Sequence, residues 1–553
     1  MISHRLIGGV LAIAAGAWLG CLAAPSPEGS NDGGVGESGT GSSGGAVVRG
    51  DGGMAGSESS AGSTGNGGST GGGSTSGASV TSSTGGASST SGMSGTGSTS
   101  GAASSTGGAG GTSGTSGGCS QTCPAFGGRT IYVDATAGVD GPCCGRQAAA
   151  GCGGPCATLG KALQALPGAG WTIQLTGDPS GDANPSEGYP IHLGKGVTLA
   201  SSGKICFSGV QGQNVFDVDQ DATTVTLTAG GGSFIIGESC AGASALATDG
   251  ILVQQAADGS SPTAVLQGLR IAGVQVGVDV EAASAQGGGV WIQSVSTGVY
   301  CGSPGQSSTA QSAFTVPDGQ SVAVSGALNS DLVAWTNCTL KGTFQLGAPA
   351  PCPATKVDDT GITAQGNASV DVGGSISCMN SYGIQLSKDS MVPGAPTVSF
   401  HGGRISHAGC AGLLAAQGTI SLSGVQVDHN HYGAELAPGG KLVLSSASAG
   451  AANSFSCNTK AEPGVCCQAG GFCPPGADVW NASGGRLSAT GDLWDDPAVT
   501  QCACEAADPA TGEPSGCSCS GGAQLHDGIA VLDLPASGET DTSGAGIAAG
   551  ACP

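Results

Sequence analysis

Short segments around residue 400 repeat one alternation of apolar and polar residues at intervals of 22 residues. Thr397–Phe400, Thr419–Leu422 and Lys441–Leu444 align so that their apolar side chains fall into two columns. Alternation with a period of two predicts strands, and none of these segments can bury its apolar row alone. We therefore expect successive coils to stack about 4.8 Å apart, as in a parallel β-solenoid.

The same interval aligns residues outside these strands. It places Leu414 over Leu436 and His407 over His429. We expect each of these pairs to occupy equivalent places on two successive coils, about one strand spacing apart.

A different pattern precedes the strands. From Ala157 to Leu166 the apolar residues recur at i, i+3, i+4 and i+7, which predicts a short amphipathic helix that Pro167 ends. Gly127–Asp134 has the alternation of a strand. A solenoid needs a cover over its first coil, because an open sheet edge pairs with other chains. We expect the helix to provide this cover.

The order of Ile131–Asp134, the helical stretch Ala157–Leu163 and the apolar stretch Trp171–Leu175 resembles the opening of right-handed parallel β-helix domains of the pectin-lyase-like superfamily. The resemblance covers roughly residues 127–500. It implies an all-β fold, a right-handed parallel β-helix with a short N-terminal capping helix, to which the cysteine clusters add disulfide-rich caps. It implies little about activity, because one fold hosts many functions.

Composition divides the chain into five parts. Between Pro25 and Gly118 nearly all residues are Gly, Ser, Thr or Ala, a composition that cannot bury enough apolar surface to fold and is typical of a disordered linker. Cysteines cluster on both sides of the strand-rich region. The predicted parts are a signal peptide (1–24), the low-complexity linker (25–118), a Cys-rich N-terminal cap (119–170), the parallel β-helix (171–455), and a Cys-rich C-terminal cap and tail (456–553).

The first 24 residues have the features of an export signal. His4 and Arg5 precede an apolar stretch from Leu6 to Leu19, and Cys21 follows a segment that resembles a bacterial lipoprotein processing site. Lipidation of Cys21 would anchor the chain to a membrane, with the linker as a tether. The alternative is ordinary cleavage near Ala24. We expect an exported protein at the cell envelope or outer surface, lipid-anchored or otherwise secreted.

The cysteine content agrees with export. The chain has 23 cysteines, so an even number remains once Cys21 is lipidated or removed, which indicates disulfides. The two pairs Cys502/Cys504 and Cys517/Cys519 have zinc-like composition, but their one-residue gaps and the export signal favour disulfides. Formal net charge is −23, which argues against nucleic acid as a partner because phosphate binding needs clustered Lys and Arg. We expect a monomer.

His407 and His429 are the strongest candidates for chemistry, because their spacing puts them at one place on successive coils. Asp428 and His431 are close to His429 in sequence, and Arg404 lies just before His407. Together, His, Asp and Arg could bind a metal ion, or supply a base and a cation that stabilises charge. The alternative is that they are polar turn residues that face water.

Two further sets are candidate ligand-binding residues. Asp217, Asp219 and Asp221 alternate along the chain, so in an extended segment their carboxylates could share one face and bind calcium. The alternative is that they are solvent-facing acids at a strand end. Trp480 and Trp494 could stack on sugar rings, although such residues also pack within caps. Calcium is the one cofactor that the sequence suggests.

Two functions from different classes remain open. The favoured one is a non-enzymatic, lipid-anchored surface β-helix that displays or binds extracellular material, with carbohydrate or an envelope protein as the partner. The alternative is a polysaccharide lyase or glycoside hydrolase, because the resemblance extends to enzymes that use calcium-bridging carboxylates with an Arg or Lys base, or Asp clusters. Neither pattern maps onto this sequence residue by residue. Convergence of Arg404, His407, Asp428 and His429 would favour an enzyme or a metal site.

Overall fold

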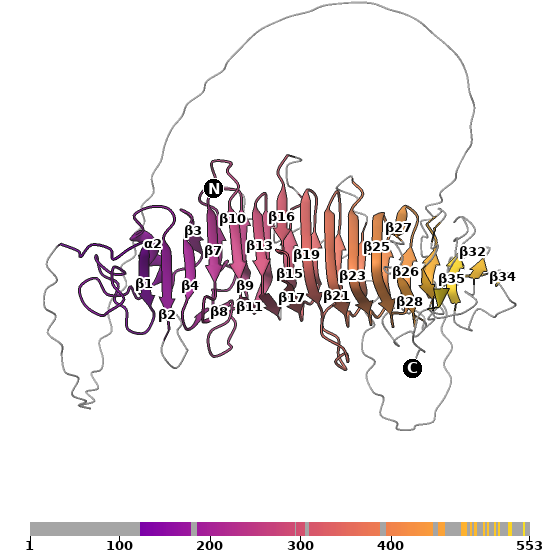
Figure 1. Ribbon diagram of the computed structural model, residues 1–553, viewed down its shortest axis with the longest axis horizontal. Helices are drawn as coiled ribbons and strands as arrows, with labels where there is room; N and C mark the ends of the chain where they lie inside the picture. The colour runs from indigo at the N-terminus through magenta and orange to yellow at the C-terminus, as the bar shows by residue number, and fades with distance from the viewer. Residues whose placement is uncertain are drawn as a thin grey trace, which may run out of the picture. The chain divides into compact units, whose positions relative to one another are not determined.

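The computed structural model of the protein describes residues 122–177, 185–293, 295–304, 309–387, 394–445, 452–458, 477–483, 487–488 and 492–494, together with short strands between residues 501 and 547. Strands dominate these residues and form one sheet of 20 strands and another of 14, both almost entirely parallel. Figure 1 shows the strands side by side, from the indigo coils at one end to the yellow coils at the other.

The coils contribute strands to three faces of the β-helix. The 20-stranded sheet forms the first and second faces, and its four longest strands run across both. The first face contains β1 (Thr130–Asp134), β2 (Thr172–Thr176), β4 (Thr198–Ser201), β7 (Thr224–Thr228), β10 (Thr263–Gln267), β13 (Ser284–Gly288), β16 (Ser312–Thr315) and β27 (Gly440–Leu444). The second contains β5 (Lys204–Phe207), β8 (Ser233–Ile236), β11 (Leu269–Ala272), β14 (Val290–Gln293), β17 (Val322–Ser325), β28 (Ser454–Ser456), β30 (Leu493–Trp494) and β36 (Gly546–Ile547). The strands that span both are β19 (Cys338–Leu346), β21 (Ser369–Ser377), β23 (Thr397–Ser406) and β25 (Gly418–Asp428).

The third face is the 14-stranded sheet, and it carries most of the side chains considered below. Its strands are β3 (Ile191–Leu193), β6 (Phe216–Val218), β9 (Ala247–Gln254), β12 (Val274–Glu281), β15 (Thr297–Cys301), β18 (Ser330–Ala334), β20 (Thr360–Ala364), β22 (Tyr382–Leu386), β24 (Ala411–Ala415), β26 (Tyr432–Leu436), β29 (Ala477–Asn481), β35 (Ile529–Asp533), β31 (Gln501–Ala503) and β34 (Ser518–Cys519). A separate hairpin consists of β32 (Ala506–Ala507) and β33 (Pro514–Ser515).

The predicted right-handed parallel β-helix is confirmed, and inward side chains of the three faces form one continuous apolar core. On the first face the predicted register is confirmed, because Phe400 pairs with Leu422 and both are buried. On the third face the predicted pairing of Leu414 with Leu436 is wrong, since Leu414 pairs with Glu435. The corner before β26 is one residue shorter than the corner before β24, so the repeat shortens on this face alone.

The capping helix is confirmed as α2 (Leu159–Gln164). The side chain of Thr158 accepts a hydrogen bond from Lys161 N and thereby begins the helix. Leu159 and Ala162 are completely buried and belong to the same core as β1. The helix therefore covers the start of the solenoid with the apolar positions that its sequence spacing predicted.

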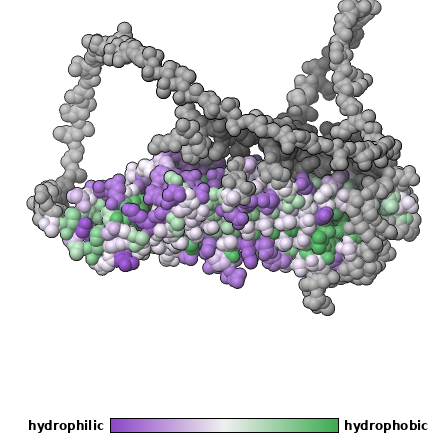
Figure 2. Space-filling model, turned by 90° about the horizontal axis from the view of Figure 1, so that it is seen from above, coloured by the Kyte–Doolittle hydropathy of each residue, from purple (hydrophilic) through white to green (hydrophobic). Residues whose placement is uncertain are grey.

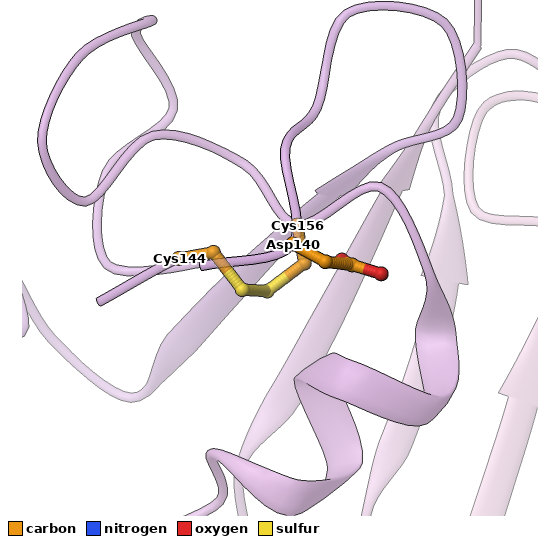
Figure 3. A group of neighbouring side chains, drawn as sticks. All are labelled: Asp140, Cys144 and Cys156. Carbon is orange, nitrogen blue, oxygen red and sulfur yellow. A yellow bond between two sulfur atoms is a disulfide. The ribbon is translucent and has the colours of Figure 1, made fainter. Parts of the chain in front are cut away.

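The Asp140 carboxylate and a disulfide lie close together beside the start of α2 (Figure 3). Cys144 and Cys156 are joined through their sulfur atoms. The Asp140 carboxylate accepts hydrogen bonds from the backbone N of Ala157 and Thr158 at 2.8 and 3.1 Å. Although Asp140, Cys144 and Cys156 lie close enough together to resemble a metal site, the disulfide leaves no thiolate to bind an ion.

The parallel sheets extend on both sides of the predicted β-helix segment, residues 171–455. β1 pairs with β2, so Thr130–Asp134 belongs to the first coil. At the other end β29 and β35 continue the third face, while β30 and β36 continue the second. Disulfides occur both at the ends and along the coils. Cys123–Cys143 and Cys144–Cys156 lie at the N-terminal end and Cys502–Cys519 at the C-terminal end, while Cys206–Cys240, Cys301–Cys338 and Cys352–Cys378 lie along the coils between them.

The disulfides also bear on where the protein resides. Cys502–Cys519 joins the two Cys-x-Cys pairs to each other, as the disulfide interpretation predicted. Bonds of this kind form in oxidising compartments and are typical of exported proteins. In the part of the chain that the structure describes, no helix is long and apolar enough to cross a membrane.

Most of the described surface in Figure 2 is purple or nearly white, with green areas nearer the two ends.

The corner between the second and third faces has the same backbone conformation in four coils. Cys378, His407, His429 and Cys457 have φ values of 63°, 60°, 56° and 59°. This left-handed conformation is uncommon for residues other than glycine, and it turns the chain sharply from one face to the next. Both candidate histidines are therefore corner residues of the solenoid, as well as outward side chains.

Buried amides connect successive coils inside this corner. Ala408 N donates to Asn430 Oδ1 at 2.9 Å, and Asn430 Nδ2 donates to Asn458 Oδ1 at 3.0 Å. Asn458 Nδ2 donates in turn to Asp478 Oδ1 at 2.7 Å. Buried polar groups need partners of this kind, so the ladder of Asn430, Asn458 and Asp478 fixes the turns on which the candidate histidines stand.

Candidate functional site

Arg404 and Asp428 form an ion pair between two successive coils, in β23 and at the end of β25. Arg404 Nε donates to the two carboxylate oxygens of Asp428 at 3.0 and 2.9 Å, and Nη2 donates to Oδ1 at 2.8 Å. Asp428 is completely buried, whereas 42% of the Arg404 side chain is exposed. A guanidinium in this geometry neutralises the carboxylate and fixes its orientation.

The two corner histidines complete this cluster. The rings of His407 and His429 stack with centroids 5.0 Å apart and an angle of 9° between their planes. His429 Nδ1 lies 3.1 Å from Asp428 Oδ1, an arrangement that can orient an imidazole as a base. Burial, followed by the neighbouring His429, lowers the pKa of His407. We call Arg404, His407, Asp428 and His429 the corner cluster.

His431 does not join the corner cluster. It is buried and packs against Tyr432, with ring centroids 4.3 Å apart. Burial lowers the pKa of His431 to about 4, so the ring is neutral at pH 7. Nearness in sequence was therefore misleading here, because the chain turns within two residues of His429.

The two candidate tryptophans lie in different surroundings. Trp494 is completely buried and stacks on Phe455 at a centroid distance of 5.3 Å, so a sugar cannot reach it and the expectation of stacking does not fit this residue. Trp480 lies on the outer side of the third face and contacts Tyr432 at 5.1 Å. It belongs to a small cluster outside the main core, where Trp480 and Tyr382 are partly buried.

A second polar cluster lies on the outer side of the third face, near its N-terminal end. His192 in β3 pairs in register with Asp217 in β6, and Asp219 follows directly after that strand. His192 Nδ1 lies 3.2 Å from Asp219 Oδ2 and 3.7 Å from Asp217 Oδ2. The exposed fractions of the side chains are 47% for His192, 8% for Asp217 and 21% for Asp219.

The predicted calcium set of three aspartates is thus only partly brought together. Asp221 is turned away, and its carboxylate accepts hydrogen bonds from the backbone N of Lys195 and Thr223 at 2.9 and 3.2 Å. β6 ends at Val218, so the extended alternation that would keep Asp221 on the same side does not continue. His192 takes the place of the third aspartate, which changes the donor set from oxygen alone to oxygen and nitrogen.

Further carboxyl groups, none of them predicted, follow along the same face. Burial and the neighbouring carboxylates of Asp217 and Glu281 raise the pKa of Asp249 to about 7. Burial, with Asp249 and Glu281 as neighbours, also raises the pKa of Asp279. Burial and the neighbouring carboxylates thus favour the protonated, neutral forms of Asp249 and Asp279.

Another unpredicted pair of carboxyl groups lies inside the solenoid. Asp331, in β18, is completely buried, and Asp358 is only 3% exposed. Asp358 Oδ1 accepts a hydrogen bond from Ala327 N at 2.8 Å, as Asn430 does from Ala408 at the corner described above. Burial and then the neighbouring Asp358 raise the pKa of Asp331, and burial raises that of Asp358.

The sequence did not predict His192, Asp249 or Asp279 as site residues, because the coils that contain them differ in length. Ile191 pairs with Phe216, and Phe216 pairs with Ile251, so successive intervals on the third face differ by ten residues. A fixed period cannot align such coils. The strand pattern of Ile191–Leu193, with an outward histidine between two buried residues, is the local signal that could have drawn attention to His192.

Comparisons with known proteins give a distant structural likeness. No family model matches the sequence, and no curated protein matches it. Among solved structures, two crystal structures of the periplasmic alginate epimerase AlgG, one of them of a mutant, align with 66% of this chain and 74% of that chain. Identity is 9% and 10%, with a TM-score of 0.25 in both cases. At this level nothing about activity or substrate passes from the epimerase to this chain.

Proposed function

We propose that the protein is an exported surface β-helix, lipid-anchored at Cys21, whose third face binds extracellular carbohydrate. The export features of the first 24 residues, the Gly/Ser-rich tether and the disulfides support the location. A stacked solenoid presents side chains at one fixed spacing along its length, which suits a long ligand that is itself repetitive.

The aromatic group on the outer side of the third face carries this proposal. Tyr382, Tyr432 and Trp480 lie on β22, β26 and β29, in a cluster separate from the main core. The disulfide Cys502–Cys519 packs beside them. Tyrosine and tryptophan combine a flat apolar ring with a polar edge, and both properties match a sugar. We define the partly buried Tyr382 and Trp480 as the aromatic group, while the buried Tyr432 packs against Trp480.

A binding screen on the full mature chain tests the proposal. Glycan arrays and polysaccharide panels, each with calcium and with a chelator, should identify a bound carbohydrate. Trp480→Ala should then weaken binding at least tenfold, in the range that buried aromatic anchors contribute to interfaces. Trp291→Ala is the matched control, because Trp291 lies on the outer side of β14 and is 48% exposed.

The outcomes separate the two partner classes. Loss of binding in Trp480→Ala alone supports the proposal. Equal binding by Trp480→Ala and wild type contradicts the assigned surface. Binding to isolated envelope proteins in the absence of any carbohydrate hit would replace the carbohydrate with a protein partner.

The convergence of the corner cluster favours a second candidate, a polysaccharide lyase or hydrolase. We infer that in such an enzyme His429 would act as the base. The Asp428 carboxylate, close to His429 Nδ1, would orient the ring. The carboxylate of Asp428 would not act as the acid, because it is buried and bound by Arg404.

Product release from acidic and neutral polysaccharides tests this candidate. His429→Ala should abolish turnover, whereas His401→Ala should leave it unchanged. His401 is not part of the corner cluster, and its Nδ1 atom lies 3.4 Å from Asp371 Oδ1. Turnover that survives His429→Ala would contradict the assignment.

A further inference from the structure

We propose that His192, Asp217 and Asp219 form a binding site for a divalent transition-metal ion of the zinc type. The site is independent of carbohydrate binding by the aromatic group, since it lies on strands β3 and β6 at the other end of the third face. Its ligands would be one imidazole nitrogen and two carboxylate oxygens.

The three ligand atoms already have the spacing that such an ion requires. All lie within 4.8 Å of one another. His192 Nδ1 is 3.2 Å from Asp219 Oδ2 and 3.7 Å from Asp217 Oδ2. Ligands about 2.0–2.1 Å from a tetrahedral zinc ion stand about 3.3 Å from each other. Small side-chain movements would therefore suffice to place the three atoms around one ion.

The Nδ1 atom of His192 faces two carboxylates at once. His192 Nδ1 carries at most one hydrogen, yet it faces both Asp219 oxygens at 3.3 and 3.2 Å and the Asp217 Oδ2 atom as well. One hydrogen can serve one carboxylate, whereas an ion can serve two. His401 shows the ordinary case, because a single carboxylate, that of Asp371, faces its ring at 3.4 Å.

The surrounding chain holds the ligands in place. His192 and Asp217 lie opposite each other on paired strands, and β6 pairs on its other side with β9. Asn214 Nδ2 donates to Asp217 Oδ1 at 2.8 Å, which orients the carboxylate that lies beside His192. Outer partners of this kind orient metal ligands and raise metal affinity.

Solvent can reach the fourth position of the site. His192 and Asp219 line an open depression together with Gln220, Ala257 and Asp258. Nearly half of the His192 side chain is exposed, so an ion can enter without unfolding the coil. A water molecule or a group of a bound ligand would complete the coordination.

The donor set selects the kind of metal. Calcium prefers six to eight oxygen ligands, and Asp221, the third oxygen donor expected from the sequence, is used in a turn. An imidazole with two carboxylates suits zinc and its neighbours in the first transition row. The proposed ion is therefore of the zinc type, bound by His192, Asp217 and Asp219, whereas the sequence suggested calcium at Asp217, Asp219 and Asp221.

Equilibrium dialysis of the full mature chain, stripped of metal and then exposed to zinc chloride at pH 7, tests the proposal. His192→Asn keeps a hydrogen-bond donor toward Asp219 but removes the metal ligand, and Asp219→Asn removes one carboxylate. Each should bind zinc at least tenfold more weakly at one site than wild type. His401→Asn is the matched control and should bind as wild type does.

Each result decides the proposal. Selective loss in His192→Asn and Asp219→Asn, with folding confirmed by circular dichroism, supports it. Zinc binding by His192→Asn equal to that of wild type overturns it. Displacement of the zinc by an equal concentration of calcium also overturns it, because an oxygen-only site would then be present.

Discussion

The two clusters of histidine and aspartate on this β-helix differ in how their charges are balanced. In the corner cluster the Arg404 guanidinium makes three contacts with Asp428, and His429 Nδ1 lies close to one oxygen of the same carboxylate. Near β3, two carboxylates face the single Nδ1 atom of His192. In the first cluster an arginine binds the carboxylate, whereas in the second two carboxylates lie beside one imidazole.

This difference teaches how to separate structural from ligand-binding groups in a solenoid. Stacked coils bring equivalent residues together whether or not they have a function, so proximity alone proves little. The buried amides of Asn430 and Asn458 are close and yet purely connective, because every donor meets an acceptor. A more useful sign of a metal site is a set of donor atoms that have the spacing of metal ligands and that solvent can reach.

Removing the arginine of the corner cluster should have the largest effect on stability. Arg404→Ala leaves the buried Asp428 carboxylate without its main cation, and we expect a loss of about 3 kcal/mol, toward the lower end for broken buried pairs because Arg404 is part exposed. Denaturant titration followed by tryptophan fluorescence measures it. His407→Ala, which leaves this ion pair intact, should cost less. Equal stability of Arg404→Ala and wild type would show that the pair does not hold the coils together.

The interior carboxyl pair sharpens the comparison through pH. The pKa of Asp331 is raised in the folded chain, so its protonated form contributes stability at low pH that is lost as pH rises through the folded pKa. The slope is at most about 1.4 kcal/mol per pH unit for one proton. Asp331→Asn should therefore reduce the fall in the free energy of unfolding above about pH 4, and it should stabilise the chain at pH 8.

A matched control for this variant exists in the same kind of position. Asp478 is also buried near the corner, but it accepts a hydrogen bond from the Asn458 amide at 2.7 Å. Asp478→Asn removes a buried carboxyl that has an amide donor beside it, and it is the reference for Asp331→Asn. If Asp331→Asn leaves the slope of stability against pH as in wild type, the raised pKa of Asp331 is not what makes stability depend on pH.

Much of the fold could be predicted because regular coils leave a periodic record. The 22-residue interval correctly placed Phe400 against Leu422 and brought His407 and His429 to one corner. The apolar spacing from Leu159 identified the capping helix. The error at Leu414 arose where one corner is a residue shorter, since a single deletion shifts every pairing on the face that follows.

The second cluster could not be predicted, because it depends on coils of unequal length. His192 and Asp217 become neighbours only when Ile191 is paired with Phe216, and no repeated spacing in the sequence predicts that register. The same holds for Asp249 and Asp279, whose mutual effect on pKa depends on the fold of the third face. Burial was equally hidden, since the sequence around Trp494 does not reveal that its ring lies in the core.

Thermal unfolding of wild type, His192→Asn and Arg404→Ala, each with zinc chloride and with a chelator, tests the distinction between the two clusters most directly. Ligands that bind the folded state raise its melting temperature. The account predicts that Arg404→Ala melts earlier but keeps the zinc-induced rise, whereas His192→Asn melts like wild type in chelator and loses that rise. A zinc-induced rise that survives in His192→Asn, or disappears in Arg404→Ala, would contradict it.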